Sequence, residues 1–257
     1  MTELIRERVG STAVLTLNRP EVRNALSPEL IAAVQDAVAG SDADEGVTAI
    51  VVTGTDPAFC AGVDLKRLAV AVEPGRQLAA ATPGFFGPLP PHRTPIIGAV
   101  NGPAVTGGFE LALACDFLLA SERATFADTH ARVGVMPGWG LTVRLPQLLG
   151  VNRAKQMSLT GDYIGATRAY EWGLVNEVVP HDQLLPRALE VAASVASIPP
   201  ANVQEVRAMY DTMVGLVGEA AWAREKAWSD AWMAARFDQG RLAAEREAIT
   251  ARGRSQQ

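Results

Sequence analysis

Cysteine, excess positive charge and long apolar runs are all scarce in this 257-residue sequence. Only Cys60 and Cys115 occur, far apart and without a CxxC or Cys/His cluster, which excludes a disulfide scaffold and favours a reducing compartment, the cytoplasm. Lys and Arg number 23 against 28 Asp and Glu, so no cationic field favours a nucleic-acid partner. Gly and Pro break the longest uncharged stretches, and charges crowd the N-terminus MTELIRERVG. We therefore expect neither a membrane span nor a signal peptide.

What the sequence does contain is an alternation of short β-type runs and helical patterns, which is typical of an α/β protein. A helix is predicted from the cap Ser27 and the first-turn Pro28 to Gly40. The β-type runs lie at 12–18, 48–54, 94–102, 115–121 and 174–180.

The C-terminal part has a different composition, rich in Ala, Glu, Arg and Trp and without further β-type runs. We predict an α/β body over 1–195 and a helical region over 196–257. Its aromatic residues need a partner surface, either another subunit or the body of the same chain. They are Trp222, Trp228, Trp232 and Phe237.

Two glycine-containing loops each follow a predicted strand and precede a helical pattern. In TGTDPAFCAGVDLKRL, Gly62 precedes Asp64, where a helix is predicted to begin; in VNGPAVTGGFELALAC, Gly107 and Gly108 lead into an apolar helix. Backbone N–H groups at such helix starts favour anions or developing negative charge. The loops are either two ordinary tight turns or the two halves of an oxyanion hole, in which each donor contributes about 3–4 kcal/mol.

The motifs FCAGVDLK at 59–66, PIIGAVNGPAVTGGFELALACDFLLAS at 95–121 and VGVMPGWG at 133–140 resemble the enoyl-CoA hydratase/isomerase (crotonase) family. LNRPEVRNALS at 17–27 and LTGDYIGATRAYEWGLVNEVV at 159–179 extend the resemblance. It implies a crotonase-like spiral of ββα units over 1–195, and a helical region over 196–257 that assembles homotrimers or dimers of trimers.

The same resemblance implies an acyl-CoA thioester as substrate, with coenzyme A as part of the substrate and neither a separate cofactor nor a metal. The backbone N–H groups of Val63 and Gly107 match the family's oxyanion hole. Further residues match positions that contact the substrate, with Trp139 either lining the acyl end or packing in the core, and Lys66 either near the CoA phosphates or simply exposed. They are Arg23, Ala61, Asp64, Leu65, Lys66, Gly108 and Trp139.

The family's hydratases hold the attacking water between two glutamates, and this chain matches only the first. Glu110 falls on that position, whereas FADTH at 126–130 places His130 where the second glutamate is expected. A neutral imidazole, with a reference pKa of about 6.5, can accept or relay a proton; alternatively, His130 only hydrogen-bonds a neighbour. Asp128 is a further acid or base, although its matching position is not catalytic in hydratases.

These residues predict an enoyl-CoA hydratase, a hydro-lyase that adds water across the double bond of a trans-2-enoyl-CoA through a stabilised enolate. Two alternatives remain because of His130. The chain is then an enoyl-CoA isomerase or another crotonase-type enzyme, or it binds acyl-CoA without turnover. His92 and His181 have no metal-ligand spacing and are predicted to face solvent from loops.

Overall fold

The computed structural model describes residues 2–64, 87–214 and 216, together with the separate positions 224, 227, 230, 231 and 235. The chain divides into two compact units, 1–204 and 205–257. This division falls a little beyond the boundary predicted at 195/196. Trp222, Trp228, Trp232 and Phe237 lie outside the described residues, so the role of the C-terminal region stays a prediction.

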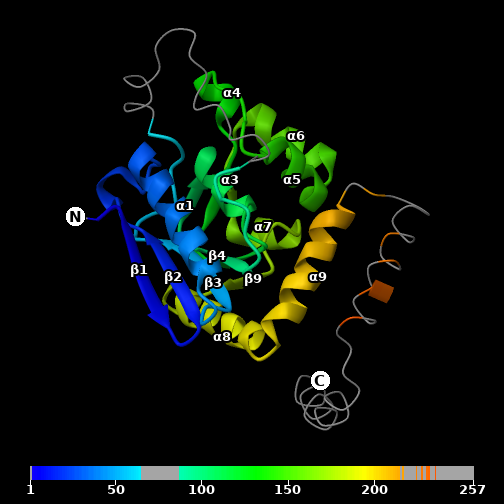
Figure 1. The fold of residues 1–257 in the computed structure, drawn as a ribbon. Helices are drawn as coiled ribbons and strands as arrows, with labels where there is room; N and C mark the ends of the chain where they lie inside the picture. The colour runs from blue at the N-terminus through cyan, green and yellow to red at the C-terminus, as the bar shows by residue number, and fades with distance from the viewer. Residues whose placement is uncertain are drawn as a thin grey trace. The chain divides into compact units, whose positions relative to one another are not determined.

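A six-stranded sheet forms the centre of the first unit (Figure 1). All neighbouring strands are parallel except β1 and β2, which form an antiparallel hairpin. In the order of the sheet, the strands are β1 (Leu4–Val9), β2 (Thr12–Leu17), β3 (Ala49–Gly54), β4 (Ile96–Val100), β6 (Phe117–Ser121) and β9 (Glu177–Val179). Each of the five predicted β-type runs therefore contains a strand, while β1 is an addition that the sequence analysis missed.

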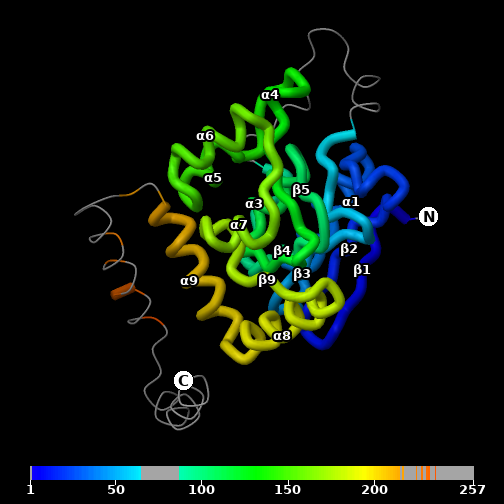
Figure 2. Tube along the Cα trace, turned by 180° about the vertical axis from the view of Figure 1, so that it is seen from behind, coloured from blue at the N-terminus to red at the C-terminus, as the bar shows by residue number. Residues whose placement is uncertain are grey.

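Side chains alternate between the two faces of this sheet, and each face is covered by helices (Figures 1 and 2). Helix α8 (Leu184–Ala196) packs Leu184, Ala188 and Ala192 on the face that includes Val14 and Val51. The opposite face carries Leu15, Val52 and their neighbours and packs against α1 (Pro28–Ala43) and α3 (Gly107–Leu113). Because both faces are buried, the central strands are almost continuously apolar.

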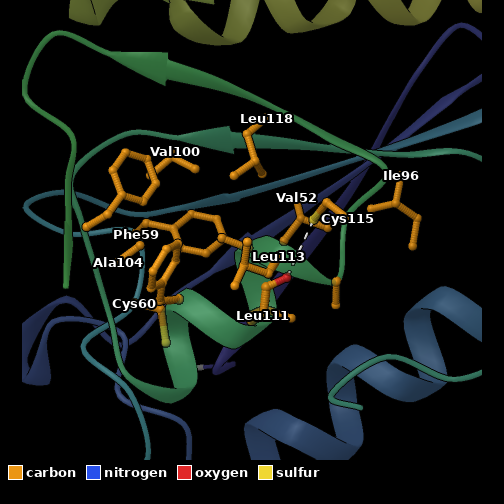
Figure 3. Packing of buried hydrophobic residues seen from close by; sticks show 14 of the residues in the cluster. Val52, Phe59, Cys60, Ile96, Val100, Ala104, Leu111, Leu113, Cys115 and Leu118 are labelled. Atoms are coloured by element: carbon orange, nitrogen blue, oxygen red, sulfur yellow. Dashed lines mark hydrogen bonds between the residues drawn. The ribbon is translucent and has the colours of Figure 1, made fainter. Parts of the chain in front are cut away.

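Helix α3 is anchored in the core by its own apolar residues. Leu111 and Leu113 lie among Val52, Ile96 and Leu118 of the sheet, as Figure 3 shows. All seven residues of α3 are buried, including the charged Glu110. The helix that begins at Gly107 is thus fixed to the rigid part of the molecule, which suits a group that must hold its position during a reaction.

A second, three-stranded sheet gives the chain its repeating units. It contains β5 (Pro103–Val105), β7 (Thr125–Ala127) and β8 (Ile164–Gly165). β4 continues into β5 and then α3, and β6 continues into β7 and then α4 (His130–Val133). Each succession is one strand–strand–helix unit, and its two strands belong to different sheets. The predicted α/β fold built from ββα units is confirmed.

The predicted helix start at Ser27 is confirmed, but its predicted end is wrong. The hydroxyl of Ser27 accepts a hydrogen bond from the backbone N–H of Leu30 at 3.0 Å, and Pro28 is the first helical residue. The helix then continues past Gly40 to Ala43. Gly40 has an ordinary helical backbone and is tolerated there, since glycine lowers helix stability without breaking the helix.

The remaining elements of the described chain are helical. They are two short 3₁₀ turns, η1 (Pro20–Val22) and η2 (His181–Gln183), and the helices α5 (Leu141–Leu149), α6 (Val151–Thr160), α7 (Ala166–Glu171) and α9 (Pro200–Met213). Within the described residues no strand follows β9, in line with the lack of β-type runs in the C-terminal part. Within the described residues, no helix combines the length and apolarity that a membrane crossing requires.

Candidate active site

The backbone N–H of Val63 belongs to a short segment that pairs with Leu26. The N–H of Leu26 donates to the carbonyl oxygen of Gly62 at 2.8 Å, and the N–H of Asp64 donates to the carbonyl oxygen of Leu26 at 3.0 Å. Because alternate residues of an extended segment point their N–H groups to opposite sides, the N–H of Val63 points away from Leu26. Gly62 has φ +97°, a conformation that favours glycine, and this turn sets the direction of the next amide.

The backbone N–H of Gly107 lies at the start of α3, where helix N–H groups have no partner within the helix. Thr106 precedes it with φ 54° and ψ −115°, a backbone conformation that is costly for a non-glycine residue. Its hydroxyl and that of Thr129 are 2.5 Å apart, which ties the strained turn to the end of β7. Strain that is held in place by surrounding contacts is typical of functional sites.

These two amides border the same small space. A Cβ atom on Gly107 would lie 3.4 Å from the backbone nitrogen of Val63, and a Cβ atom on Gly62 would lie 3.4 Å from that of Gly107. Within the described parts of the chain, neither N–H donates to an acceptor. The structure thus brings together two donors for which the described residues offer no acceptor, as an oxyanion hole requires.

Glu110 lies one helical turn beyond Gly107 and is almost fully buried, with 3% of its surface exposed. Its Oε1 accepts hydrogen bonds from the backbone N–H groups of Trp139, at 2.8 Å, and Leu141, at 3.4 Å. The Gly138–Gly140 turn therefore holds one oxygen of the carboxylate, and the second oxygen faces His130. A buried carboxylate fixed in this way is oriented for proton transfer through Oε2.

His130 is also buried and lies between two carboxylates. Its Nε2 is 3.6 Å from Oε2 of Glu110, and its Nδ1 is 2.6 Å from Oδ1 of Asp128. The backbone N–H of His130 donates to the same Oδ1 at 3.1 Å. His130 therefore links the carboxyl groups of Asp128 and Glu110, and Glu110 is on the same helix as Gly107.

The charge of His130 differs from the expectation of a neutral imidazole. Burial alone would lower the pKa of His130, but the hydrogen bond to Asp128 and the nearby charges of Glu110 and Asp128 raise it to about 9. Burial likewise opposes ionisation of Asp128, yet hydrogen bonds from His130 and Ser158 keep the pKa of Asp128 below its usual value. At neutral pH the imidazole is therefore a cation, which can donate a proton but has no free lone pair to accept one.

Sequence reasoning gave Asp128 little weight, because it considered the residue only as an acid or base in its own right. The structure instead places it behind His130, 1% exposed and hydrogen-bonded to both the ring and the backbone of that residue. The spacing Asp-x-His carries a local signal for this arrangement. An aspartate at the end of a strand readily accepts a hydrogen bond from the backbone N–H two residues later.

The residues expected to contact the substrate near the first loop have different environments. Arg23 is exposed, with φ 53°, and its carbonyl oxygen accepts the N–H of Ala61 at 3.0 Å. Asp64 pairs with the buried guanidinium of Arg19 at 3.2 Å, so its carboxylate has a structural partner. Leu65 and Lys66 lie outside the described residues.

Gly108 and Trp139, both predicted to contact the substrate, also have different surroundings. A Cβ atom on Gly108 would lie 2.2 Å from the carbonyl oxygen of Cys60, so this glycine allows α3 to pack against the first loop. A Cβ atom on Gly107 would lie 3.5 Å from Cζ3 of Trp139, which places the indole beside the two amides. Trp139 also packs against the main core, as one of its two predicted alternatives states, while lining of the acyl end stays a prediction.

Two residues predicted to face solvent are instead partly buried. His181 bonds Ser121 at 3.0 Å and Asp56 at 2.9 Å, and His92 bonds the carbonyl oxygen of Pro90 at 2.8 Å. Both histidines therefore have structural partners. Within the described part of the chain, no group of three or more His, Cys, Asp or Glu residues is arranged to hold a metal ion.

Comparison with known proteins identifies the family. The family model described as "Enoyl-CoA hydratase/isomerase" matches residues 7–248. A probable peroxisomal enoyl-CoA hydratase 1 of Arabidopsis thaliana is 41% identical over 191 residues, which are 74% of this chain and 71% of that protein. The crotonyl-CoA hydratase of Syntrophomonas wolfei is 37% identical over 196 residues, covering 76% and 75% of the two chains.

Solved structures give the same result. The enoyl-CoA hydratase from Mycobacterium tuberculosis H37Rv is 48% identical, with a TM-score of 0.74 over 82% of this chain and 88% of that chain. A monofunctional enoyl-CoA isomerase from M. smegmatis is 26% identical, with a TM-score of 0.71 over 86% of this chain and 98% of that chain. The fold is therefore shared by proteins whose names state different reactions.

Proposed function

Because the chain belongs to the enoyl-CoA hydratase/isomerase family, we propose that it is a hydro-lyase that adds water across the double bond of a trans-2-enoyl-CoA thioester. One observation carries this proposal. The carboxylate of Glu110 lies 3.6 Å from the imidazole of His130 and one helical turn beyond Gly107, and the backbone N–H groups of Gly107 and Val63 have no acceptor among the described residues. Hydration requires a base for water, an acid for the α-carbon and a site for negative charge on oxygen, and these groups supply all three.

The two amides act on the thioester carbonyl. When the N–H groups of Val63 and Gly107 bind this oxygen, they withdraw electron density and make the β-carbon electrophilic. They stabilise the enolate that forms when oxygen from water bonds to the β-carbon. Each donor fixed in a dry site contributes about 3–4 kcal/mol to such a transition state.

Glu110 is the base and His130 is the acid. As water attacks, Oε2 of Glu110 accepts a proton from it, while Oε1 stays hydrogen-bonded to Trp139 and Leu141. Nε2–H of His130 then donates its proton to the α-carbon, and the enolate electrons form the new C–H bond. The product is a 3-hydroxyacyl thioester, which contains every atom of the substrate and the water.

After this step the protein holds a protonated Glu110 and a neutral His130. Transfer of the proton from Oε2 of Glu110 to Nε2 of His130 restores the starting charges. The 3.6 Å separation of these atoms is close to hydrogen-bonding distance, so a small approach or one bridging water completes the transfer. The cycle therefore needs no proton from an additional side chain.

The remaining features of the proposal concern binding and assembly. Arg23 is exposed beside Ala61 and is suited to a CoA phosphate, while Trp139 borders the space for the acyl group. We also propose a homotrimer or a dimer of trimers located in the cytoplasm. Large apolar side chains exposed on α5 to α7 support a subunit contact, among them Val143, Leu148, Leu159 and Tyr170. Light scattering at several protein concentrations tests this assembly.

Isomerisation is the second candidate, and the isomerase-named structural relative favours it. Moving a double bond from the 3,4 to the 2,3 position needs one base that carries a proton between two carbons, and Glu110 alone supplies it. The cationic His130 favours hydration, because an acid separate from the base is present. A protein that only binds acyl-CoA has no need for this charged pair.

The absorbance of the conjugated enoyl thioester separates these functions. Hydration of crotonyl-CoA removes the conjugation, so the absorbance falls, and mass spectrometry shows the gain of one water. With a 3-enoyl-CoA, isomerisation makes the absorbance rise. Binding of either thioester with neither change would overturn the proposal of an enzyme, and a rise without a fall would replace the hydratase by the isomerase.

A further inference from the structure

We propose that Asp128 is the positioning residue of this site: it fixes the imidazole of His130 so that Nε2 faces Glu110 and keeps the ring cationic, which assigns His130 the role of acid and Glu110 that of base. This inference rests on the proposed function. It adds a residue that does not touch the reacting atoms and acts through its neighbour.

Asp128 holds the imidazole of His130 in one orientation. Oδ1 of Asp128 is 2.6 Å from Nδ1 of His130 and accepts the backbone N–H of His130 at 3.1 Å. One carboxylate oxygen therefore fixes both the ring and the backbone of the same residue. The ring cannot turn over without losing the Nδ1 bond, so Nε2 is held toward Glu110. Because Asp128 is 1% exposed, water does not compete with this contact.

The imidazole of His130 is also subject to neighbouring charges. Two charged groups act on it, Asp128 from the end of β7 and Glu110 from α3. Helix α6 packs against α4, and from it the Ser158 hydroxyl hydrogen-bonds Asp128. A cation between two carboxylates is stabilised by both, and the loss of either weakens its hold on the proton.

The charge of Asp128 decides whether His130 has a proton at Nε2 to donate. If Asp128 loses its charge, the pKa of His130 falls and a larger fraction of the ring is neutral at a given pH. A neutral ring with its proton on Nδ1 offers Glu110 a lone pair at Nε2 and has no proton there for the α-carbon. The site then lacks its acid although all the groups that touch the substrate remain.

The variant Asp128→Asn tests this inference because asparagine keeps the size of the side chain and removes its charge. Asp162→Asn is the matched control, since Asp162 is an exposed carboxylate whose ion pair with Arg132 lies outside the site. The readouts are the ¹⁵N chemical shifts of the His130 ring across pH and the pH profile of kcat/KM with crotonyl-CoA. The chain has only three histidines, so the His130→Gln spectrum identifies the His130 signals.

In the wild type and in Asp162→Asn, we expect His130 to titrate with a pKa of about 9 and kcat/KM to fall above that pH. In Asp128→Asn, we expect the titration and the alkaline fall in rate to move together to lower pH by about one to two units. We expect kcat at pH 8 to fall about two- to tenfold, with KM changed little.

The result that overturns the inference is a His130 titration and ring tautomer that Asp128→Asn leaves unchanged. A wild-type His130 that titrates near its ordinary value overturns it as well, and this measurement needs no variant to fold. If the ring signals respond as expected but the wild type hydrates no enoyl thioester, the proposed function fails and the positioning of His130 by Asp128 stands.

Discussion

The site has two parts of different construction. The amides of Val63 and Gly107 come from two backbone turns, and their side chains supply nothing to the proposed oxyanion hole. The acid–base part consists of the side chains of Glu110, His130 and Asp128, each held by contacts with the others or with backbone amides. The two parts share the β5–β7 strand pair, because Gly107 and Glu110 follow the end of β5, and Asp128 and His130 follow the end of β7.

Because of this difference, the two parts respond differently to amino-acid substitutions. A backbone amide survives most substitutions at its own position, so the first part depends on glycines and on the turn geometry. In a network of side chains, a single substitution changes the net charge. The site then works only if a neighbouring residue supplies the opposite charge. The pair of His130 and Asp128 is such a combination, since the aspartate supplies the negative charge that keeps the histidine cationic.

The largest effect is expected in the side-chain part, at Glu110. Glu110→Gln keeps the oxygen that accepts the N–H groups of Trp139 and Leu141 but removes the base, so kcat for hydration falls about 10³-fold while binding of acyl-CoA changes little. Steady-state kinetics and calorimetric titration measure the two quantities. Glu171→Gln, at an exposed position on α7, is the control. Full turnover of Glu110→Gln would remove this residue from the mechanism.

The next effect is expected in the backbone part, at Gly107. A Cβ atom there would lie 3.1 Å from Cγ2 of Val63 and 3.4 Å from its backbone nitrogen, inside the space for the thioester oxygen. Gly107→Ala should therefore lower kcat about 10²-fold. Gly40→Ala, in helix α1 away from the site, is the control because no atom lies within 4 Å of its Cβ position. Equal rates for both variants would show that the oxygen does not bind between the two amides.

A smaller effect is expected for His130→Glu. It tests whether His130 only occupies the place of a missing carboxylate or acts as a cationic acid. If the site merely lacked a second carboxylate, His130→Glu would raise the rate of hydration. The structure predicts the opposite, about a tenfold loss, because the new carboxylate would face both Glu110 and Asp128. The double variant Asp128→Asn with His130→Glu relieves one repulsion and should recover part of the loss. A gain in kcat for His130→Glu alone would contradict the compensating role of Asp128.

The smallest effect concerns stability. The folded-state pKa of His130 is raised to about 9, so the stabilisation from its charged form is complete below the unfolded value of about 6.5 and is lost as pH rises through 9. His130→Gln lacks this dependence. The difference in Tm between wild type and variant, followed by calorimetry, should therefore be largest near pH 6 and shrink toward pH 9.5. A difference that grows over this range would mean that His130 is not a stabilised cation.

The backbone part could be predicted from the sequence to a large extent. Glycines at 62 and 107 between strand and helix patterns, together with the family motifs, indicated both loops, and the structure brings their amides together. The five predicted strand regions were correct because continuous apolar runs are typical of a sheet buried on both faces. The short strands β5, β7 and β8 were missed because two or three residues carry no recognisable period.

The side-chain part was harder to predict because its meaning depends on distances across the fold. The sequence identified Glu110 and His130 but treated the imidazole as neutral, since reference pKa values ignore neighbouring charges. Only the structure shows the contact of 2.6 Å between His130 and Asp128. The end of α1 was misjudged at Gly40 for a related reason, because the last turn of the helix contacts a distant segment: Asp42 accepts hydrogen bonds from the backbone N–H groups of Arg93 and Thr94.

The most direct test of the proposed oxyanion hole is a crystal structure of the protein with a bound 3-oxoacyl-CoA. We expect the thioester oxygen about 2.7–3.1 Å from the backbone nitrogens of both Val63 and Gly107, with the β-carbon facing Glu110 and His130. A thioester oxygen beyond hydrogen-bonding distance of either nitrogen, or amides already bound to acceptors of the chain itself, would contradict it.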